Sequence, residues 1–140
     1  MKTIALNNTE LNRGVSLFNR AHFFDAHEVL EDVWRPLPRD RPLRRHLQGM
    51  VQLAVAFHHQ SKGNHVGARS VLERALRNLN GANTSFPHLD LDRLRSELAP
   101  WQRYLDHPES ASDRKLERHD LRRHDPKSSV PPLPKIMKRR

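Results

Sequence analysis

The chain has 140 residues, which is enough for one domain with a hydrophobic core and too few for two comfortable ones. It contains no cysteine, so disulfide bonds, thiolate metal sites and thiol nucleophiles are excluded. The net charge is +9: residues 1–106 carry 15 Lys and Arg against 11 Asp and Glu, and residues 107–140 carry 10 against 5. This charge suggests a polyanionic partner, which would bind mainly to the last quarter of the chain.

The N-terminal stretch MKTIALNNTELNR lacks an apolar leader segment, and no apolar run approaches the length of a membrane span. We therefore expect a cytoplasmic protein without a membrane partner. The sequence leaves the oligomeric state open.

Helical periodicity runs through most of the chain, and no segment shows a convincing strand pattern. Thr9 is predicted to cap the first helix, on which Leu11 and Phe18 share one face. Asp90 is predicted to cap the fifth helix, which Pro100 should bend or divide. The predicted helices cover residues 9–20, 22–35, 43–61, 66–79 and 90–105.

An internal repeat relates the two halves of this region. The segments AHEVLEDVW (26–34) and ARSVLERAL (68–76) share A-x-x-V-L-E at an offset of 42 residues, and Ala21 corresponds to Gly63. Each unit is then two helices joined by a tight small-residue turn, similar to a tetratricopeptide hairpin. The predicted fold is therefore all-α, with two αα-hairpins that supply four core helices and a fifth helix that closes the core.

The composition changes near residue 107, which predicts a compact helical domain over 1–106 and a basic, proline-containing extension over 107–140. In the extension, only Leu116 and Leu121 could anchor one marginal helix. The end, PKSSVPPLPKIMKRR, predicts an extended segment that docks on the core or stays mobile. We interpret PPLP as a stiff docking segment, with a polyproline ligand as the alternative.

The second predicted helix carries polar groups beside its buried face. On a helical wheel of about 100° per residue with Phe23 at zero, His27 lies at about 40°, Glu31 at about 80° and Glu28 at about 140°. His27 and Glu31 are therefore one turn apart at the edge of the core.

The third predicted helix is apolar almost all round, except for one polar stripe formed by Gln48, Gln52 and His59. Burying such groups without partners would cost several kcal/mol, about 1–3 for each. We therefore expect the stripe to face His27 and Glu31 on the preceding helix.

The segments FNRAHFFDAHEVLEDVW, LQGMVQLAVAFHHQSKGN and GARSVLERAL resemble the bacterial domain of unknown function family 309 over about residues 15–80. The family shows A-H-E-x-x-E-x-x-W, L-Q-G-x-x-Q-x-A and a G-N turn. The resemblance implies a compact all-α domain and brings no established reaction. This chain departs from the family pattern at Ala21, where glycine is usual, and at Asp25, where glutamate is common. The family's characteristic polar positions correspond to His27, Glu28, Glu31, Gln48, Gln52 and His59.

Three interpretations of these polar residues stay open. They could form a structural hydrogen-bonded network that fixes helix register, or line a pocket for an organic ligand. Alternatively, His27, Glu31 and His59, with or without Glu28, could bind a divalent metal that activates water. Metal-dependent hydrolysis is the only enzyme class that the sequence suggests. His58 and Trp34 are interpreted as packing residues.

A basic connection offers another interpretation. The stretch RPLPRDRPLRR carries five arginines against one aspartate. With the basic tail residues, it could hold phosphate groups of nucleic acid without sequence specificity, and the alternative is a solvated basic surface. The candidates are Arg39, Arg41, Arg44 and Arg45, beside Arg35 and, in the tail, Arg122, Arg123, Lys135, Lys138, Arg139 and Arg140. Taken together, the sequence predicts a binding or interaction module with a structural His/Glu/Gln network between the second and third helices. The partner is unknown, with a protein or a nucleic acid as candidates, and metal-dependent hydrolysis and nucleic-acid binding are the alternative functions.

Overall fold

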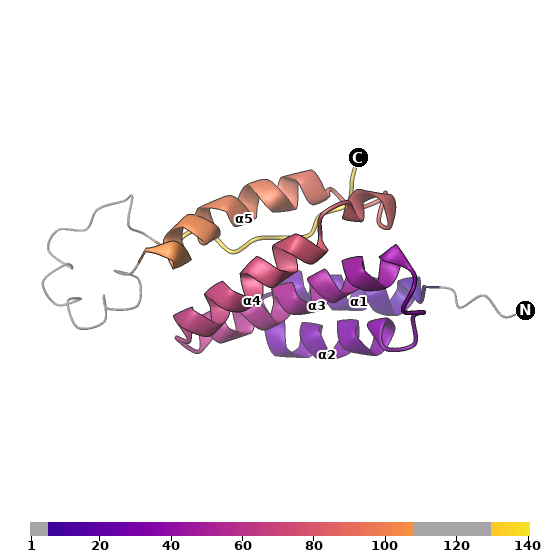
Figure 1. The fold of residues 1–140 in the computed structure, drawn as a ribbon, viewed down its shortest axis with the longest axis horizontal. Coiled ribbons are helices and arrows are strands. Elements are labelled where there is room, and N and C mark those ends of the chain that lie inside the picture. Colours follow the sequence, from indigo (N-terminus) through magenta and orange to yellow (C-terminus); the bar gives the residue numbers. More distant parts are fainter. Residues whose placement is uncertain (1–5, 108–129) are drawn as a thin grey trace, which may run out of the picture.

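The computed structural model describes residues 6–107 and 130–140. These residues form five α-helices and no β-strand, which confirms the predicted all-α fold (Figure 1). The elements are α1 (Asn8–Asn19), α2 (Phe23–Trp34), α3 (Pro42–Ser61), α4 (His65–Asn78), a 3-10 turn η1 (Ala82–Thr84) and α5 (Leu91–Asp106). Within this described part, no helix is both long and apolar enough to cross a membrane.

The two hairpin turns have the same geometry, as the internal repeat predicts. Ala21 between α1 and α2 has a φ of 63°, and Gly63 between α3 and α4 has a φ of 78°. In each turn the N–H of the next residue donates to the carbonyl five positions earlier, at 2.9 Å and 2.8 Å. This left-handed residue and its bond form the usual C-terminal cap of a helix. The 42-residue repeat is therefore a repeat of backbone conformation, with glycine in only one copy.

The helix ends agree with the prediction at one cap and differ at another. Asn7, not Thr9, caps α1: its side-chain oxygen accepts from the N–H of Glu10 at 3.2 Å. Asp90 caps α5 as predicted and accepts from the N–H of Arg93 at 3.1 Å. Pro100 lies inside α5 without dividing it.

Consecutive helices pack against one another, from α1 on α2 through to α4 on α5. The glycine of the L-Q-G segment permits the close approach of α3 to α4. A Cβ added at Gly49 would lie 2.8 Å from Cγ of Leu79 and 3.1 Å from the carbonyl oxygen of Ala75. No larger residue fits there without a shift of α4, so this motif position is explained by packing.

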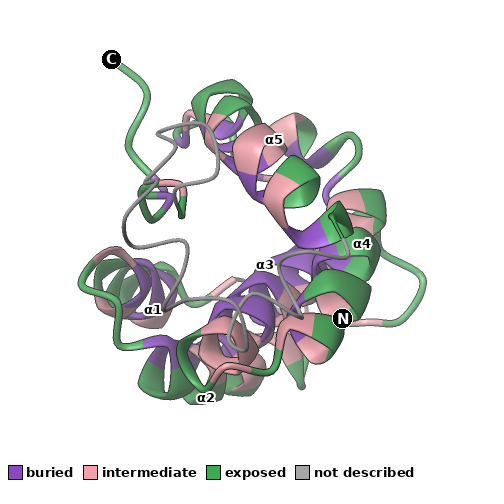
Figure 2. Cartoon of the chain, turned by 90° about the vertical axis from the view of Figure 1, so that its left-hand side faces the viewer, coloured by how far each residue is buried: buried purple, intermediate pink, exposed green. Residues whose placement is uncertain are grey.

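Aromatic rings join four of the helices in one core. Phe57 of α3 lies 5.6 Å from Phe23 of α2, 6.2 Å from Phe18 of α1 and 5.0 Å from Trp101 of α5, measured between ring centroids. Buried residues line the inner faces of the helices and exposed residues the outer faces (Figure 2). The fifth helix therefore closes the core, as the sequence predicts.

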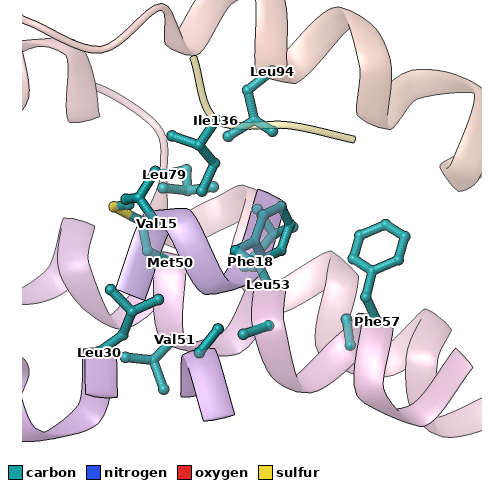
Figure 3. Close-up of a cluster of buried hydrophobic side chains, with 14 of the residues drawn as sticks. Val15, Phe18, Leu30, Met50, Val51, Leu53, Phe57, Leu79, Leu94 and Ile136 are labelled. Atoms are coloured by element: carbon teal, nitrogen blue, oxygen red, sulfur yellow. The ribbon is translucent and has the colours of Figure 1, made fainter. Parts of the chain in front are cut away.

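The C-terminal residues 130–140 are extended and run along α5 (Figure 1). Ile136 is 2% exposed and belongs to the same hydrophobic core as the helices. Figure 3 shows its side chain pointing toward Leu79 and Val15, with Leu94 of α5 nearby. Docking of the chain's end on the core is thus confirmed for these residues. The predicted helix around Leu116 and Leu121, and the basic residues Arg122 and Arg123, lie outside the described residues.

Candidate functional site

The polar edge of α2 is an ion-pair line on the surface. Nε2 of His27 lies 3.8 Å from Oε2 of Glu31, and their side chains are 25% and 36% exposed. The other oxygen of Glu31 accepts from Arg35 at 3.1 Å, while Glu28 is exposed. At such exposure the Glu31–Arg35 ion pair contributes about 0.2–0.5 kcal/mol. These contacts keep the polar groups of α2 within their own helix.

The polar stripe of α3 faces α4 and the turn that leads into it. Oε1 of Gln52 accepts from Nδ2 of Asn78 in α4 at 2.7 Å. Nδ1 of His59 lies 3.2 Å from Nδ2 of Asn64, whose Oδ1 caps α4 by accepting from Gly67. Gln48, on the same stripe, is half-buried. The predicted network between the second and third helices is therefore wrong: the stripe exists, but its partners come from the next hairpin.

The three candidate metal ligands are not brought together. Within residues 6–107 and 130–140, no group of three or more His, Cys, Asp or Glu side chains could hold a metal ion, and His59 is engaged with Asn64. His58 lies instead against the ring of Phe24, with centroids 5.3 Å apart. That contact agrees with its interpretation as a packing residue.

Arg44, a candidate phosphate ligand, is used at the end of α2. Its Nη1 donates to the carbonyls of Leu37 at 2.6 Å and Arg35 at 3.2 Å. Its guanidinium carbon also lies 4.1 Å from the ring centroid of Trp34, in a cation–π contact. Trp34 is half-buried and packs on the core. Its ring also supports Arg44 through the cation–π contact.

Arg45 serves the end of α4 in the same way. Its guanidinium donates to the carbonyls of Arg77 at 3.2 Å and Asn80 at 3.3 Å. Positive charge at a helix C-terminus is favoured because the terminal carbonyls carry partial negative charge. Arg39 and Arg41 are exposed. Two of the four phosphate candidates therefore have structural roles in the fold.

The most developed recognition contacts lie where the C-terminal segment meets the helices. The side-chain amide of Asn19 in α1 binds both backbone groups of Ile136. Its oxygen accepts from the Ile136 N–H at 2.7 Å, and its nitrogen donates to the Ile136 carbonyl at 2.9 Å. A primary amide matches the spacing of a peptide N–H and C=O, so Asn19 pairs with the segment as a neighbouring strand would.

Two side chains of α5 bind the same segment from the other side. Nε1 of Trp101 donates to the carbonyl of Pro132 at 2.9 Å, and Trp101 is 1% exposed. Oε1 of Glu97 accepts from the backbone N–H of Lys135 at 2.9 Å. Each of these contacts is made to the backbone of the segment and not to its side chains.

The backbone before α5 completes the set. The N–H of Asp90 donates to the carbonyl of Met137 at 2.8 Å, and the N–H of Arg139 donates to the carbonyl of His88 at 2.7 Å. An isolated antiparallel bridge pairs Leu89 with Lys138. We call Asn19, Glu97, Trp101 and the backbone of residues 88–90 the tail-docking surface.

Sequence patterns do not reveal this surface. Asn19 and Ile136 are 117 positions apart, and Asn19 lies just outside the apolar face of its helix. A buried histidine was also missed, although the helical wheel of α3 places His46 within the apolar arc at about 200° from Arg44. The polar side chain of His46 within the apolar arc of α3 is the sequence feature that could have indicated its buried role.

His46 is 2% exposed and holds the loop after α4. Its Nδ1 lies 2.6 Å from Oγ of Ser85, and its Nε2 lies 3.2 Å from Nη2 of Arg45. The imidazole also forms a hydrogen bond with the backbone of Asn80 in the same loop. Burial first, and the charge of Arg45 second, lower the pKa of His46. With its contacts to Ser85 and the Asn80 backbone, His46 anchors the loop after α4.

The comparison with known proteins agrees with the motifs. Residues 11–71 match the family described as Domain of unknown function (DUF309). This match confirms the resemblance carried by the A-H-E and L-Q-G segments. The chain is 33% identical over 73 residues to "Uncharacterized protein YpuF" of Bacillus subtilis (strain 168), covering 52% of this chain and 41% of that protein. It is 28% identical over 81 residues to an uncharacterized protein of Aquifex aeolicus (strain VF5), covering 58% of this chain and 24% of that one.

The chain thus spans less than half the length of the curated relatives it matches. The DUF309 match covers α1 from residue 11 onward, all of α2 and α3, and the first half of α4. Asn19 lies inside the match, whereas Glu97, Trp101 and residues 130–140 follow it. The tail-docking surface is accordingly built from the DUF309 segment together with the C-terminal part of this chain.

Proposed function

We propose that this protein is a helical binding module that holds an extended peptide on the tail-docking surface, and that its own residues 130–140 occupy that surface in cis. The observation that carries the proposal is the pair of bonds between Asn19 and the backbone of Ile136. An amide that satisfies both backbone groups of one residue recognises extended chain in general rather than one side chain.

The other contacts support the same role. Trp101 and Glu97 also bind backbone atoms, and residues 88–90 add two backbone hydrogen bonds. Proteins that add an extended peptide to their surface gain affinity from such main-chain bonds and specificity from alternate side chains. The segment follows this pattern, because Pro134 and Ile136 are buried while Lys135 between them is exposed.

The same contacts would also serve a tail that only completes the core. The two roles differ in whether a separate peptide can replace the attached segment. A binding surface accepts the same sequence as a separate molecule, whereas a surface whose tail is a fixed part of the core does not. A full-length variant with a disengaged tail can distinguish them. Ile136→Asp should disengage it, because an unpaired carboxylate is strongly disfavoured in an apolar core.

We expect a fluorescent peptide of residues 130–140 to bind the Ile136→Asp chain with micromolar affinity and to raise its melting temperature. The matched control is Leu133→Asp, whose position is 47% exposed, so that the tail stays docked and the peptide binds much more weakly. Equal, negligible binding to both folded chains would contradict the proposal. If Ile136→Asp loses its helical circular dichroism, Ile136→Ala replaces it, since alanine adds no buried charge.

A further inference from the structure

We infer that the tail-docking surface selects one class of ligand: an extended peptide with proline at one position and an aliphatic residue two positions later. This inference rests on the proposed function and specifies its partner. The chain's own Pro134 and Ile136 define the class, and the native tail acts as a competitor tethered in cis.

Backbone N–H groups of the segment are bound at defined positions. The N–H groups of Lys135, Ile136 and Arg139 each donate a hydrogen bond to the rest of the protein. Proline has no N–H, so a ligand with proline at any of these three positions would leave an acceptor of the surface without its partner. The surface therefore excludes proline at defined positions.

The segment contains prolines only at positions where its N–H is not used. Residues 131, 132 and 134 are prolines, and proline can occupy them because the bonds described above need no N–H there. Prolines hold the free chain in an extended conformation, so less conformational entropy is lost on docking. Proline is therefore favoured at the position of Pro134, just before the first N–H that the surface binds.

Side chains of the segment alternate between buried and exposed. Pro134 and Ile136 are buried, whereas Leu133 and Met137 are 47% and 37% exposed. This alternation is that of a strand lying on a surface. Ile136 enters the apolar core (Figure 3), where a polar or charged side chain would be disfavoured. An aliphatic residue is thus required at this position, while the exposed side chains at positions 133 and 137 are free to vary.

Charge does not define the ligand. Lys135, Lys138 and Arg139 are exposed, and within residues 6–107 and 130–140 none of them forms a salt bridge. The basic residues of the tail are therefore not recognised by the docking surface. A partner peptide needs the aliphatic residue, is favoured by proline two positions earlier, and does not need positive charge.

The covalently attached tail competes with any partner peptide for the tail-docking surface. Because residues 130–140 are covalently attached, they compete at an effective concentration on the order of 1 mM. A partner peptide must overcome this competition, so its apparent affinity for the wild-type chain is lower than for a chain with a disengaged tail.

Competition binding tests the ligand class on the full-length Ile136→Asp chain, with labelled wild-type 130–140 peptide as the probe. Relative to the unlabelled wild-type peptide, peptides with Lys135→Pro or Ile136→Ser should compete at least tenfold more weakly. Peptides with Leu133→Ser or Lys138→Ser are the matched controls and should stay within twofold. If the Ile136→Asp chain does not fold, the same panel is measured on Ile136→Ala.

The outcomes separate the two proposals. If the wild-type peptide binds neither chain, the binding function itself fails. If the wild-type peptide binds but Lys135→Pro and Leu133→Ser compete equally well, the binding function stands and the ligand class is overturned. If the Lys138→Ser peptide competes as weakly as the Ile136→Ser peptide, attraction by charge governs binding, and the Pro-x-aliphatic selection is overturned.

Discussion

Asn19 and Ile136 are joined by two hydrogen bonds between a side-chain amide and a backbone, although 117 positions separate them. The pair connects the end of α1 to the last residues of the described chain. Trp101 and Glu97 bind the same segment from α5, so the segment links the first helix to the last. The C-terminal residues are therefore both part of the core and the occupant of a recognition surface.

Asn19→Ala should lower the free energy of unfolding by about 2 kcal/mol, because two hydrogen bonds of about 1 kcal/mol each are lost. Urea denaturation at neutral pH measures this change. Asn12→Ala is the control, since Asn12 is exposed on the same helix, and it should change stability by less than about 0.5 kcal/mol. Equal effects of the two substitutions would show that the Asn19 contact does not hold the tail.

Ala21→Gly should stabilise the protein. The φ of 63° at Ala21 costs an L-residue about 1–2 kcal/mol, partly offset by the greater freedom of glycine in the unfolded chain. We expect a net gain of about 0.5–1 kcal/mol by the same denaturation measurement. The reverse substitution, Gly63→Ala in the equivalent turn, should destabilise by about 1 kcal/mol. Two changes of the same sign would contradict the equivalence of the turns.

Arg44→Ala should destabilise the protein by about 2 kcal/mol, because charged hydrogen bonds to the end of α2 and the contact with Trp34 are both lost. Thermal and urea unfolding measure the effect. Arg39→Ala removes an equal charge from an exposed position and should leave stability within about 0.5 kcal/mol. Should Arg44→Ala be as stable as Arg39→Ala, the capping role assigned to Arg44 would be wrong.

Stability should fall as the pH is lowered below about 6.5. The pKa of His46 is lowered in the folded protein, mainly by burial, so the unfolded chain takes up this proton first. The contribution of His46 is therefore fully present above pH 6.5 and is lost progressively toward its lower folded pKa. Denaturation curves between pH 8 and pH 5 measure the slope, which should be shallower for His46→Asn. An unchanged slope in that variant would assign the effect to other groups.

Features set by local sequence could be predicted, and features set by distant neighbours could not. The helices, their order and the repeated turn follow from periodicity and from small residues such as Gly63. The sequence correctly predicts the polar stripe of α3 but places its partners on α2 instead of α4. A helical wheel gives the direction in which a side chain points, and it does not show which neighbouring helix lies in that direction. Arg44 looked like a phosphate ligand because sequence does not show which carbonyls are within reach. The role of Asn19 depends on residues at the other end of the chain.

The most direct test of the account follows the backbone amide of Ile136 by nitrogen-15 NMR in the wild-type, full-length chain. Unlabelled 130–140 peptide is added up to several millimolar, because the tethered tail competes at about 1 mM. We predict that the Ile136 signal moves from its docked position toward that of a free peptide as the added peptide takes its place. A docked signal that stays unchanged throughout the titration would contradict exchange at this surface, and the tail would then be a fixed part of the core.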